Sequence, residues 1–259
     1  MNSDAVRDSS SCVPVRATYL SHMQTVAFFD LDNTLVRGSS LFHFGRFIVS
    51  RGFIPRRELV RFAKAEAQLA IRRTEPEGGP QAIAERVLGL ARGRERDGLV
   101  ELSREFCRAQ LDSKLVSYVA AELRSLIRSG VPTYIVTASP IELASAVADH
   151  LGMSGALGTV AEVVEGTYSG RLSGPICHGE AKFATVTAFV EDNGIDLATS
   201  WAYSDSINDM PLLASAGTSV VVNPNRRFAH VAAKNGWRIL DSNSAVINPS
   251  VEHLHAASA

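Results

Sequence analysis

Short apolar runs alternate with amphipathic segments along much of the chain. The runs at 25–29, 133–137, 200–203 and 218–222 are typical of short buried strands. Segments with helical spacing flank the last three of these runs. Strands that alternate with helices predict a mainly parallel sheet covered by helices on both faces, which is an α/β fold.

End signals place the helices that we expect. Apolar residues recur at helical spacing over 115–127, and Gly130 followed by Pro132 ends that segment. Pro140 in a first turn opens the next helix, which runs to about residue 151 and closes at Gly152. Two more helices are expected at 180–193 and 208–216.

Residues 38–112 interrupt the alternation, because no convincing strand pattern occurs there. The segment predicts several helices, broken near 52–55 and near 75–80, and so an all-helical cap inserted between the first and second strands. Residues 158–174 show a strand-like alternation of side chains on both sides of a central Glu165-Gly166, which favours a β-hairpin. The expected organisation is a discontinuous core (23–37 and 131–241), a helical cap (38–130), a disordered N-terminal extension (1–22) and a loosely ordered tail (242–259).

The composition is that of a soluble globular protein. The 259 residues are 46% hydrophobic and 20% charged, and no apolar run has the length of a membrane span. Residues 1–22 lack the apolar stretch of a secretory signal, and they could also be upstream translation before a start at Met23. Cys12, Cys107 and Cys177 form neither a disulfide framework nor a zinc pattern, which fits a reducing cytoplasm.

Charge is distributed unevenly along the chain. Residues 37–130 hold 18 Lys and Arg against 11 Asp and Glu, a local net charge of +7, and the other residues carry −8. A basic middle segment could attract an anionic substrate, although solvated helix faces are the commoner reason for such arginines. Aromatic residues are not interleaved with the basic ones, so nucleic-acid binding is not expected. The sequence does not define an oligomeric state.

Asp30 and Asp32 follow directly on the first predicted strand. Burial of a carboxylate beside a hydrophobic strand costs several kcal/mol unless a cation or hydrogen bonds compensate. Two such residues one position apart therefore indicate a metal or a reaction. The alternative for either residue alone is an N-cap or an acidic turn.

Further polar residues occur where the other strands end. Because ligands of open α/β sheets bind outside the carboxyl ends of the strands, these residues are expected to meet in one crevice. They are Thr137 to Ser139 after the second strand, Ser204 to Asp209 after a later one, and Lys182 at the start of a helix. Taken singly, Lys182 could be a solvated lysine and Thr137 a strand-end cap.

This set of residues suits phosphoryl transfer through a covalent aspartyl-phosphate. A carboxylate can attack phosphorus only when the charge between the two anions is neutralised, which Mg²⁺ does with carboxylate, carbonyl and water oxygens. A hydroxyl and a lysine would hold the other phosphate oxygens. A second carboxylate two positions on can protonate the leaving alkoxide and then activate water. Asp30 and Asp32 fit these two roles, because residues i and i+2 of a strand face the same way.

The chain resembles the haloacid dehalogenase (HAD) superfamily, and within it the phosphoserine-phosphatase-like members with a helical cap. Four ordered motifs over residues 25–240 carry the resemblance: 30–34, Thr137, Lys182 and 205–209. The resemblance implies a Rossmann-like core and a Mg²⁺-dependent phosphatase that acts on a small-molecule phosphate ester.

The resemblance also implies a role for each motif residue. Asp30 would be the nucleophile and Asp32 the general acid and base. Mg²⁺ would be bound by Asp30, the backbone carbonyl of Asp32, and Asp205, with Asp209 as a further ligand or a neighbour of the ligands. Thr137 and Lys182 would contact the phosphoryl oxygens, and Asn208 would lie near the phosphate.

Two departures bear on the substrate. Phosphoserine phosphatases carry a Glu near the position of Ser39, and they follow the hydroxyl of the second motif with paired glycines where this chain has Ala138-Ser139-Pro140. A sugar, cyclitol or amino-alcohol phosphate is therefore favoured over free phosphoserine. Ser39, Ser40 and Ser139 are candidates to line the substrate cleft. The N-cap of a helix over 41–49 is an equally good explanation of Ser39 and Ser40.

Three alternatives remain open from the sequence. The chain could be a phosphoserine phosphatase proper, or a phosphotransferase that passes the phosphoryl group to an alcohol. It could also be a non-catalytic phosphate-binding module, which would have no need of the acid and base residue Asp32.

Overall fold

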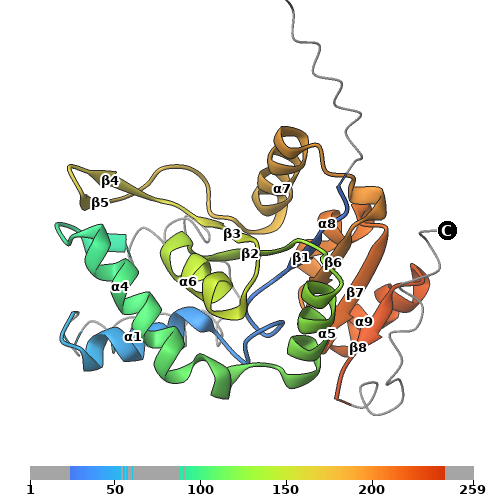
Figure 1. Cartoon of the computed structure of the whole chain (residues 1–259), viewed down its shortest axis with the longest axis horizontal. Coiled ribbons are helices and arrows are strands. Elements are labelled where there is room, and N and C mark those ends of the chain that lie inside the picture. The colour runs from blue at the N-terminus through green and yellow to red at the C-terminus, as the bar shows by residue number, and fades with distance from the viewer. Residues whose placement is uncertain are drawn as a thin grey trace, which may run out of the picture.

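A six-stranded parallel sheet forms the centre of the computed structural model (Figure 1). The structure describes residues 24–53 and 91–242, together with 55, 57, 60, 88 and 89. The strand order is β3-β2-β1-β6-β7-β8, and every neighbouring pair is parallel. The strands are β1 (Ala27–Phe29), β2 (Thr133–Pro140), β3 (Gly155–Thr159), β6 (Trp201–Ser204), β7 (Thr218–Val222) and β8 (Arg238–Leu240). The predicted α/β fold is confirmed.

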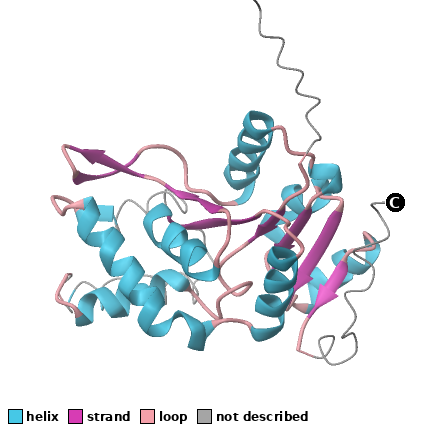
Figure 2. Ribbon diagram, viewed as in Figure 1, coloured by secondary structure: helices cyan, strands magenta, loops and turns pink. Residues whose placement is uncertain are grey.

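Helices cover both faces of the sheet (Figure 2). Successive side chains of a strand point to opposite faces, so Ala27 and Phe29 belong to one buried cluster, and Val26 and Phe28 to the other. The helices that follow and precede strands of the sheet in the first cluster are α5 (Ser117–Arg128) and α6 (Ile141–Leu151), and residues of the inserted segment after β1 belong to it as well. The helices of the second cluster are α7 (Gly179–Asn193), α8 (Met210–Ser215) and α9 (Arg226–Lys234).

The insertion after β1 contains helix α1 (Ser40–Ser50) and helix α4 (Arg96–Phe106). Helix α4 continues into a π-helical turn (Cys107–Leu111) and a 3-10 turn (Asp112–Lys114). The chain enters and leaves the insertion side by side, because Val36 pairs with Leu115 and the Arg37 N–H donates to the Lys114 carbonyl at 2.8 Å. The predicted helix break near 52–55 follows the end of α1, whereas the break near 75–80 lies outside the described residues.

The limit of the insertion differs from the one expected. The range 38–130 includes α5, but α5 packs on the sheet: Glu122 accepts from the Tyr203 hydroxyl of β6 at 2.9 Å and pairs with Arg238 of β8. We therefore draw the end of the insertion before α5. The described residues of α1 and α4 are helical, as predicted for a cap.

The hairpin prediction is correct in part. Strands β4 (Ala161–Val164) and β5 (Thr167–Leu172) pair antiparallel around Glu165 and Gly166, whose φ angles are 49° and 80°. Residues 158 and 159, however, belong to β3 of the main sheet. The hairpin also bonds to the insertion, since Tyr168 exchanges backbone hydrogen bonds with Gly93 and Arg94.

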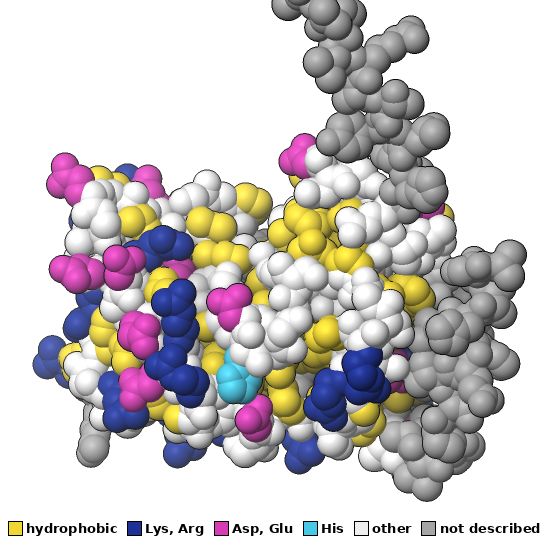
Figure 3. Space-filling view, in the orientation of Figure 1, with side chains coloured by type: hydrophobic (Ala, Val, Ile, Leu, Met, Phe, Trp, Pro, Cys, Tyr) yellow, Lys and Arg dark blue, Asp and Glu magenta, His cyan; other side chains and the backbone are white. Residues whose placement is uncertain are grey.

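The described Lys and Arg residues of α1 and α4 lie on a surface of mixed charge. Figure 3 shows Lys and Arg side chains over α1 and α4 with acidic side chains between them. Arg51 pairs with Glu105, while Arg104 and Arg108 both pair with Glu101. Part of the basic surplus of residues 37–130 is thus the ordinary salt-bridged face of a helix. In the ranges that the structure describes, no helix is long and apolar enough to cross a membrane.

Candidate active site

The predicted site residues follow the carboxyl ends of neighbouring strands. Asp30 comes directly after β1, and its backbone N–H donates to the Tyr203 carbonyl of β6 at 2.9 Å. Asp205 follows the last residue of β6. Thr137 and Ser139 lie near the end of β2, which continues to Pro140 and is longer than the sequence predicted. Because β1 pairs with both β2 and β6, all three chain segments meet at one edge of the sheet.

The turn after β1 brings Thr34 back to Asp30. The backbone N–H groups of Leu35 and Val36 both donate to the Leu31 carbonyl, at 3.0 and 2.9 Å. Asn33 adopts a left-handed conformation with φ of 56°, and its side-chain oxygen accepts from the Gly38 N–H at 3.1 Å. The chain therefore reverses within a few residues of the carboxylates.

Thr34 connects two of the carboxylates. Its hydroxyl lies 3.3 Å from Oδ2 of Asp30 and 3.5 Å from Oδ1 of Asp205, and it accepts from the Asp205 backbone N–H at 3.0 Å. Thr34 is fully buried. A buried hydroxyl that joins two carboxylates fixes their relative position.

Lys182 joins the nucleophile candidate to a third carboxylate. Its Nζ donates to Oδ1 of Asp30 at 2.7 Å and to Oδ2 of Asp209 at 2.6 Å. Lys182 lies in the first turn of α7 and is 3% exposed, so it is not a solvated lysine. Ser204 also donates to Oδ2 of Asp209, at 2.6 Å, and thereby orients that carboxylate.

A second chain of hydrogen bonds holds Asp32. The Ser40 backbone N–H donates to Oδ1 of Asp32 at 2.7 Å, and the hydroxyls of Ser40 and Ser139 are 2.9 Å apart. The Ser139 N–H donates in turn to the Thr137 hydroxyl at 3.1 Å. Asp32 is thus tied through the start of α1 to the end of β2.

The hydrogen bonds of Ser39 and Asn208 involve their own segments of the chain and not the carboxylates of the site. Ser39 is the N-cap of α1, and its hydroxyl accepts from the Phe42 N–H at 3.2 Å, which agrees with the capping alternative. Asn208 is exposed, and its backbone N–H donates to the Ser206 hydroxyl. The substrate-binding roles of both residues stay predictions.

Burial shifts the acid–base properties of the carboxylates. It raises the pKa of Asp205 to about 6 and raises the pKa of Asp32 above its ordinary value. The pKa of Asp30 is also raised, because burial and the charge of Asp209 outweigh the attraction of Lys182. Burial alone would lower the pKa of Lys182, but Asp30 and Asp209 raise it, so this lysine is charged at neutral pH.

The set carries more buried negative than positive charge. In the described part of the chain Lys182 pairs with Asp30 and Asp209, and no Lys or Arg pairs with Asp205. Among the described residues, no group of three or more His, Cys, Asp or Glu side chains is already arranged so that it could hold a metal ion. A hard divalent cation held by one or two carboxylates, a carbonyl and water fits this set, because Mg²⁺ keeps several waters and needs few protein ligands.

Sequence reasoning assigned no role to Thr34, Ser204 or Ser206. Thr34 belongs to the first motif, and its hydroxyl four residues after Asp30 was the available signal. Ser204 binds Asp209, and its Oγ accepts from the Ser206 N–H at 3.0 Å. Ser204 ends β6 and Ser206 lies in the loop after it, so both serines help to position Asp205 and Asp209.

The parallel sheet thus places aspartates, and a buried lysine paired to one of them, outside the carboxyl ends of its strands, where open α/β sheets bind their ligands. The chain belongs to the haloacid dehalogenase-like hydrolases, whose family model matches residues 27–214. The resemblance found from the motifs is confirmed, and the chain is an enzyme of this family.

Named relatives agree with this assignment. The chain is 37% identical to phosphoserine phosphatase SerB1 of Mycobacterium tuberculosis, over 85% of this chain and 71% of that protein. It is 27% identical to a histidinol-phosphatase of Neisseria meningitidis, over 85% and 99%. A crystal structure of a protein of unknown function from Bordetella pertussis superposes with a TM-score of 0.74 at 26% identity, over 85% of this chain and 99% of that one.

Proposed function

We propose that this protein is a Mg²⁺-dependent phosphatase that hydrolyses a small-molecule phosphomonoester through an aspartyl-phosphate. The observation that carries the proposal is the environment of Asp30. One oxygen of its carboxylate binds Lys182 at 2.7 Å, and the other lies 3.3 Å from the Thr34 hydroxyl. A carboxylate fixed at both oxygens at the end of a strand is positioned to attack, and the adjacent lysine can balance the charge of the incoming phosphate.

The proposed reaction has two steps. In the first, a carboxylate oxygen of Asp30 forms a bond to phosphorus while the bond from phosphorus to the ester oxygen breaks, and Asp32 gives its proton to the leaving alkoxide. In the second, Asp32 takes a proton from water as the water oxygen attacks phosphorus. Phosphate leaves, and the Asp30 carboxylate is restored. The raised pKa of Asp32 favours the protonated form that the first step needs.

The other residues position these groups. Lys182 and Thr137 would hold phosphoryl oxygens, and Ser40 and Ser139 would fix Asp32 and line the cleft. Asp30, Asp205 and the carbonyl of Asp32 would hold Mg²⁺, with Asp209 orienting Lys182 or adding a ligand. The bound cation supplies neutralisation of charge between the carboxylate and the phosphate. Closure of the insertion over the site would exclude bulk water.

The substrate class is a sugar, cyclitol or amino-alcohol phosphate. The name of the Neisseria relative specifies an amino-alcohol phosphate, which supports that part of the class. SerB1 is named for phosphoserine, so phosphoserine belongs in any substrate panel. Ser39 stands where a phosphoserine phosphatase carries a Glu, and here it caps α1. This difference favours sugar, cyclitol and amino-alcohol phosphates over phosphoserine.

Replacement of the nucleophile tests the proposal. Asp30→Asn should lose phosphate release from p-nitrophenyl phosphate and from the ester panel by at least a thousandfold in Mg²⁺, while its far-UV spectrum stays native. Asp192→Asn, on an exposed part of α7, is the matched control and should keep full activity. Near-normal turnover by Asp30→Asn would show that the covalent mechanism is wrong.

Two rival functions are separated by the products. A phosphotransferase would yield a new phosphate ester when an alcohol acceptor is added, whereas a phosphatase releases inorganic phosphate with or without it. A phosphate-binding module would release no phosphate from any ester in Mg²⁺. The buried Asp30–Lys182–Asp209 arrangement supports catalysis over binding alone.

A further inference from the structure

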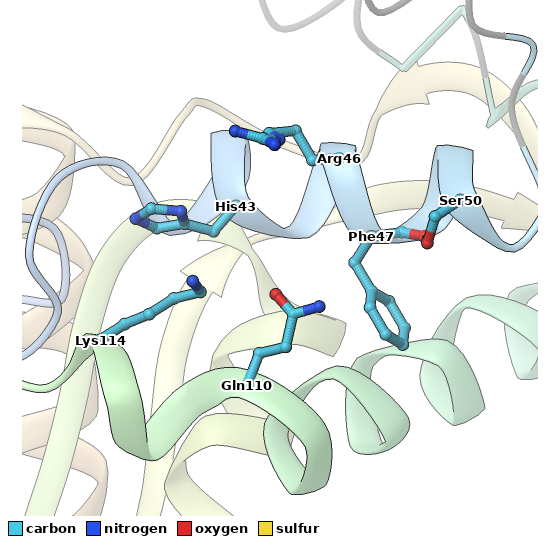
Figure 4. Close-up of a pocket in the computed structure, with 6 residues that line it drawn as sticks. All are labelled: His43, Arg46, Phe47, Ser50, Gln110 and Lys114. Carbon is cyan, nitrogen blue, oxygen red and sulfur yellow. The ribbon is translucent and has the colours of Figure 1, made fainter.

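A cavity of about 360 Å³ lies between α1 and the segment that leads out of the insertion (Figure 4). It is lined by described residues of α1 and of the turns 107–114: His43, Arg46, Phe47, Ser50, Gln110 and Lys114. These lining residues do not include the catalytic and metal-binding candidates described above. The cavity is therefore lined by other residues than the site, but it lies beside it, since His43 is close enough to lower the pKa of Asp32.

Among the described residues of the lining, Arg46 and Lys114 carry positive charge and none is acidic. Within the described ranges, neither Arg46 nor Lys114 forms an ion pair. Two described acidic residues near the lining have partners elsewhere, since Glu105 pairs with Arg51, and Asp112 lies 3.0 Å from His150. Figure 4 shows Lys114 on the side of α1 that faces Gln110, and the Arg46 guanidinium on the other side of the helix, at the rim of the cavity. Both cations favour an anion there.

The other described residues of the lining add hydrogen-bonding groups and an apolar wall. Figure 4 shows Lys114 and Gln110 extending toward α1, and His43 extending from α1 on the same side as Lys114. The His43 ring is fixed because its Nε2 lies 2.9 Å from the Arg37 carbonyl, an acceptor to which it must donate. Gln110 can donate through its carboxamide, and the buried ring of Phe47 forms an apolar wall.

We propose that this cavity binds a small organic anion that carries a phosphate group, with Lys114 as the charged contact, Gln110 as a neutral donor and Arg46 as a second cation at the rim. Its volume falls in the range of small-ligand pockets, about 300–1,000 Å³, so a small phosphate ester fills it better than inorganic phosphate does.

The position of the cavity gives the ligand a mechanical consequence. Lys114 accepts the Arg37 N–H through its backbone carbonyl, and His43 binds the Arg37 carbonyl, so both linkers of the insertion adjoin the cavity. A ligand that contacts both α1 and Lys114 would connect the first helix of the insertion to the segment through which the chain leaves it.

Binding to the metal-free protein tests this proposal without any measurement of activity. In EDTA no cation offsets the buried aspartates of the active site, and at pH 8, above the raised pKa values of Asp30 and Asp205, their charge weakens anion binding there. Calorimetric titration with inorganic phosphate and with glycerol 3-phosphate should give one site per chain, with the ester binding more tightly. No saturable binding at tens of millimolar, or equal affinity for both probes, would overturn the proposal.

Charge reversal locates the site. Lys114→Glu and Arg46→Glu should each weaken the binding of glycerol 3-phosphate at least tenfold, because an attraction becomes a repulsion. Lys234→Glu, an exposed cation in the last turn of α9, is the matched control and should leave binding unchanged. Equal loss in the control variant would mean that only the overall charge of the protein attracts the anion, and the cavity would not be a site.

Discussion

The structure gives Thr34 a role that the sequence motif did not predict, because its hydroxyl joins two of the carboxylates. Val36 and Leu35 bond to Leu31, and the left-handed Asn33 reverses the chain, so the Thr34 hydroxyl reaches Asp30 and Asp205. Neighbours that orient metal ligands typically contribute 10- to 100-fold to affinity or activity. Thr34 is such a neighbour of two of the proposed ligands.

Thr34→Val should therefore impair use of the metal without a large change in shape. The variant keeps the side-chain volume but loses the hydroxyl, so the Asp205 N–H loses its acceptor and the two carboxylates lose their link. We expect the Mg²⁺ concentration for half-maximal activity to rise about 10- to 100-fold. Thr34→Ser keeps a hydroxyl and should stay near wild type. An unchanged Mg²⁺ requirement in Thr34→Val would refute the role of Thr34.

The buried carboxylates also predict how pH and Mg²⁺ act together on stability. The pKa values of Asp30, Asp32 and Asp205 are raised in the folded protein, that of Asp205 to about 6, against about 4 in an unfolded chain. The folded metal-free protein therefore binds more protons than the unfolded one between those values. Its stability falls as pH rises through that window.

Mg²⁺ should offset this loss, because the cation replaces protons at the same carboxylates. Thermal unfolding in EDTA and in Mg²⁺ should show a larger gain in Tm from the metal at pH 7.5 than at pH 5.0. If the gain were the same at both values, proton release from these carboxylates would not accompany metal binding.

The individual strands and helices differ in how far the sequence predicts them. β1 and β7 were predictable because apolar residues dominate both. β3, with the sequence Gly-Ala-Leu-Gly-Thr, has little strand preference of its own and forms because β2 offers an edge to pair with. The positions of Asp30 and Lys182 followed from strand and helix ends, whereas the contacts of Thr34 and Ser204 depend on turn geometry that no sequence pattern states.

The turn before β7 supports a prediction about packing. A Cβ added at Gly217 would lie 2.0 Å from the Ala198 carbonyl oxygen, which is backbone and cannot rotate away. Gly217→Ala should therefore shift the 197–199 turn against β7 and destabilise the protein by about 1–3 kcal/mol or more. Urea unfolding measures this change. Gly174→Ala, where a Cβ meets nothing within 4 Å, is the control, and equal stability of the two variants would contradict the argument.

The insertion and the sheet share one buried cluster. Phe44, Phe47 and Phe106 of the insertion belong to the same cluster as Phe29 of β1 and Val147 of α6. The hairpin adds a further connection through the backbone bonds of Tyr168 to Gly93 and Arg94. The described part of the insertion is thus joined to the core by packing as well as by its linkers, so the two are expected to unfold together.

A cavity made in the insertion should therefore destabilise the sheet. Phe106 is 1% exposed, and its ring centroid lies 5.7 Å from those of both Phe44 and Phe47. Phe106→Ala should cost about 3–5 kcal/mol. Fluorescence of Trp201 and Trp237, which lie on and beside the strands of the sheet, should report the same lowered urea midpoint as the far-UV signal of the helices. A tryptophan midpoint that stayed at the wild-type value while the helical signal fell would show that the insertion unfolds by itself.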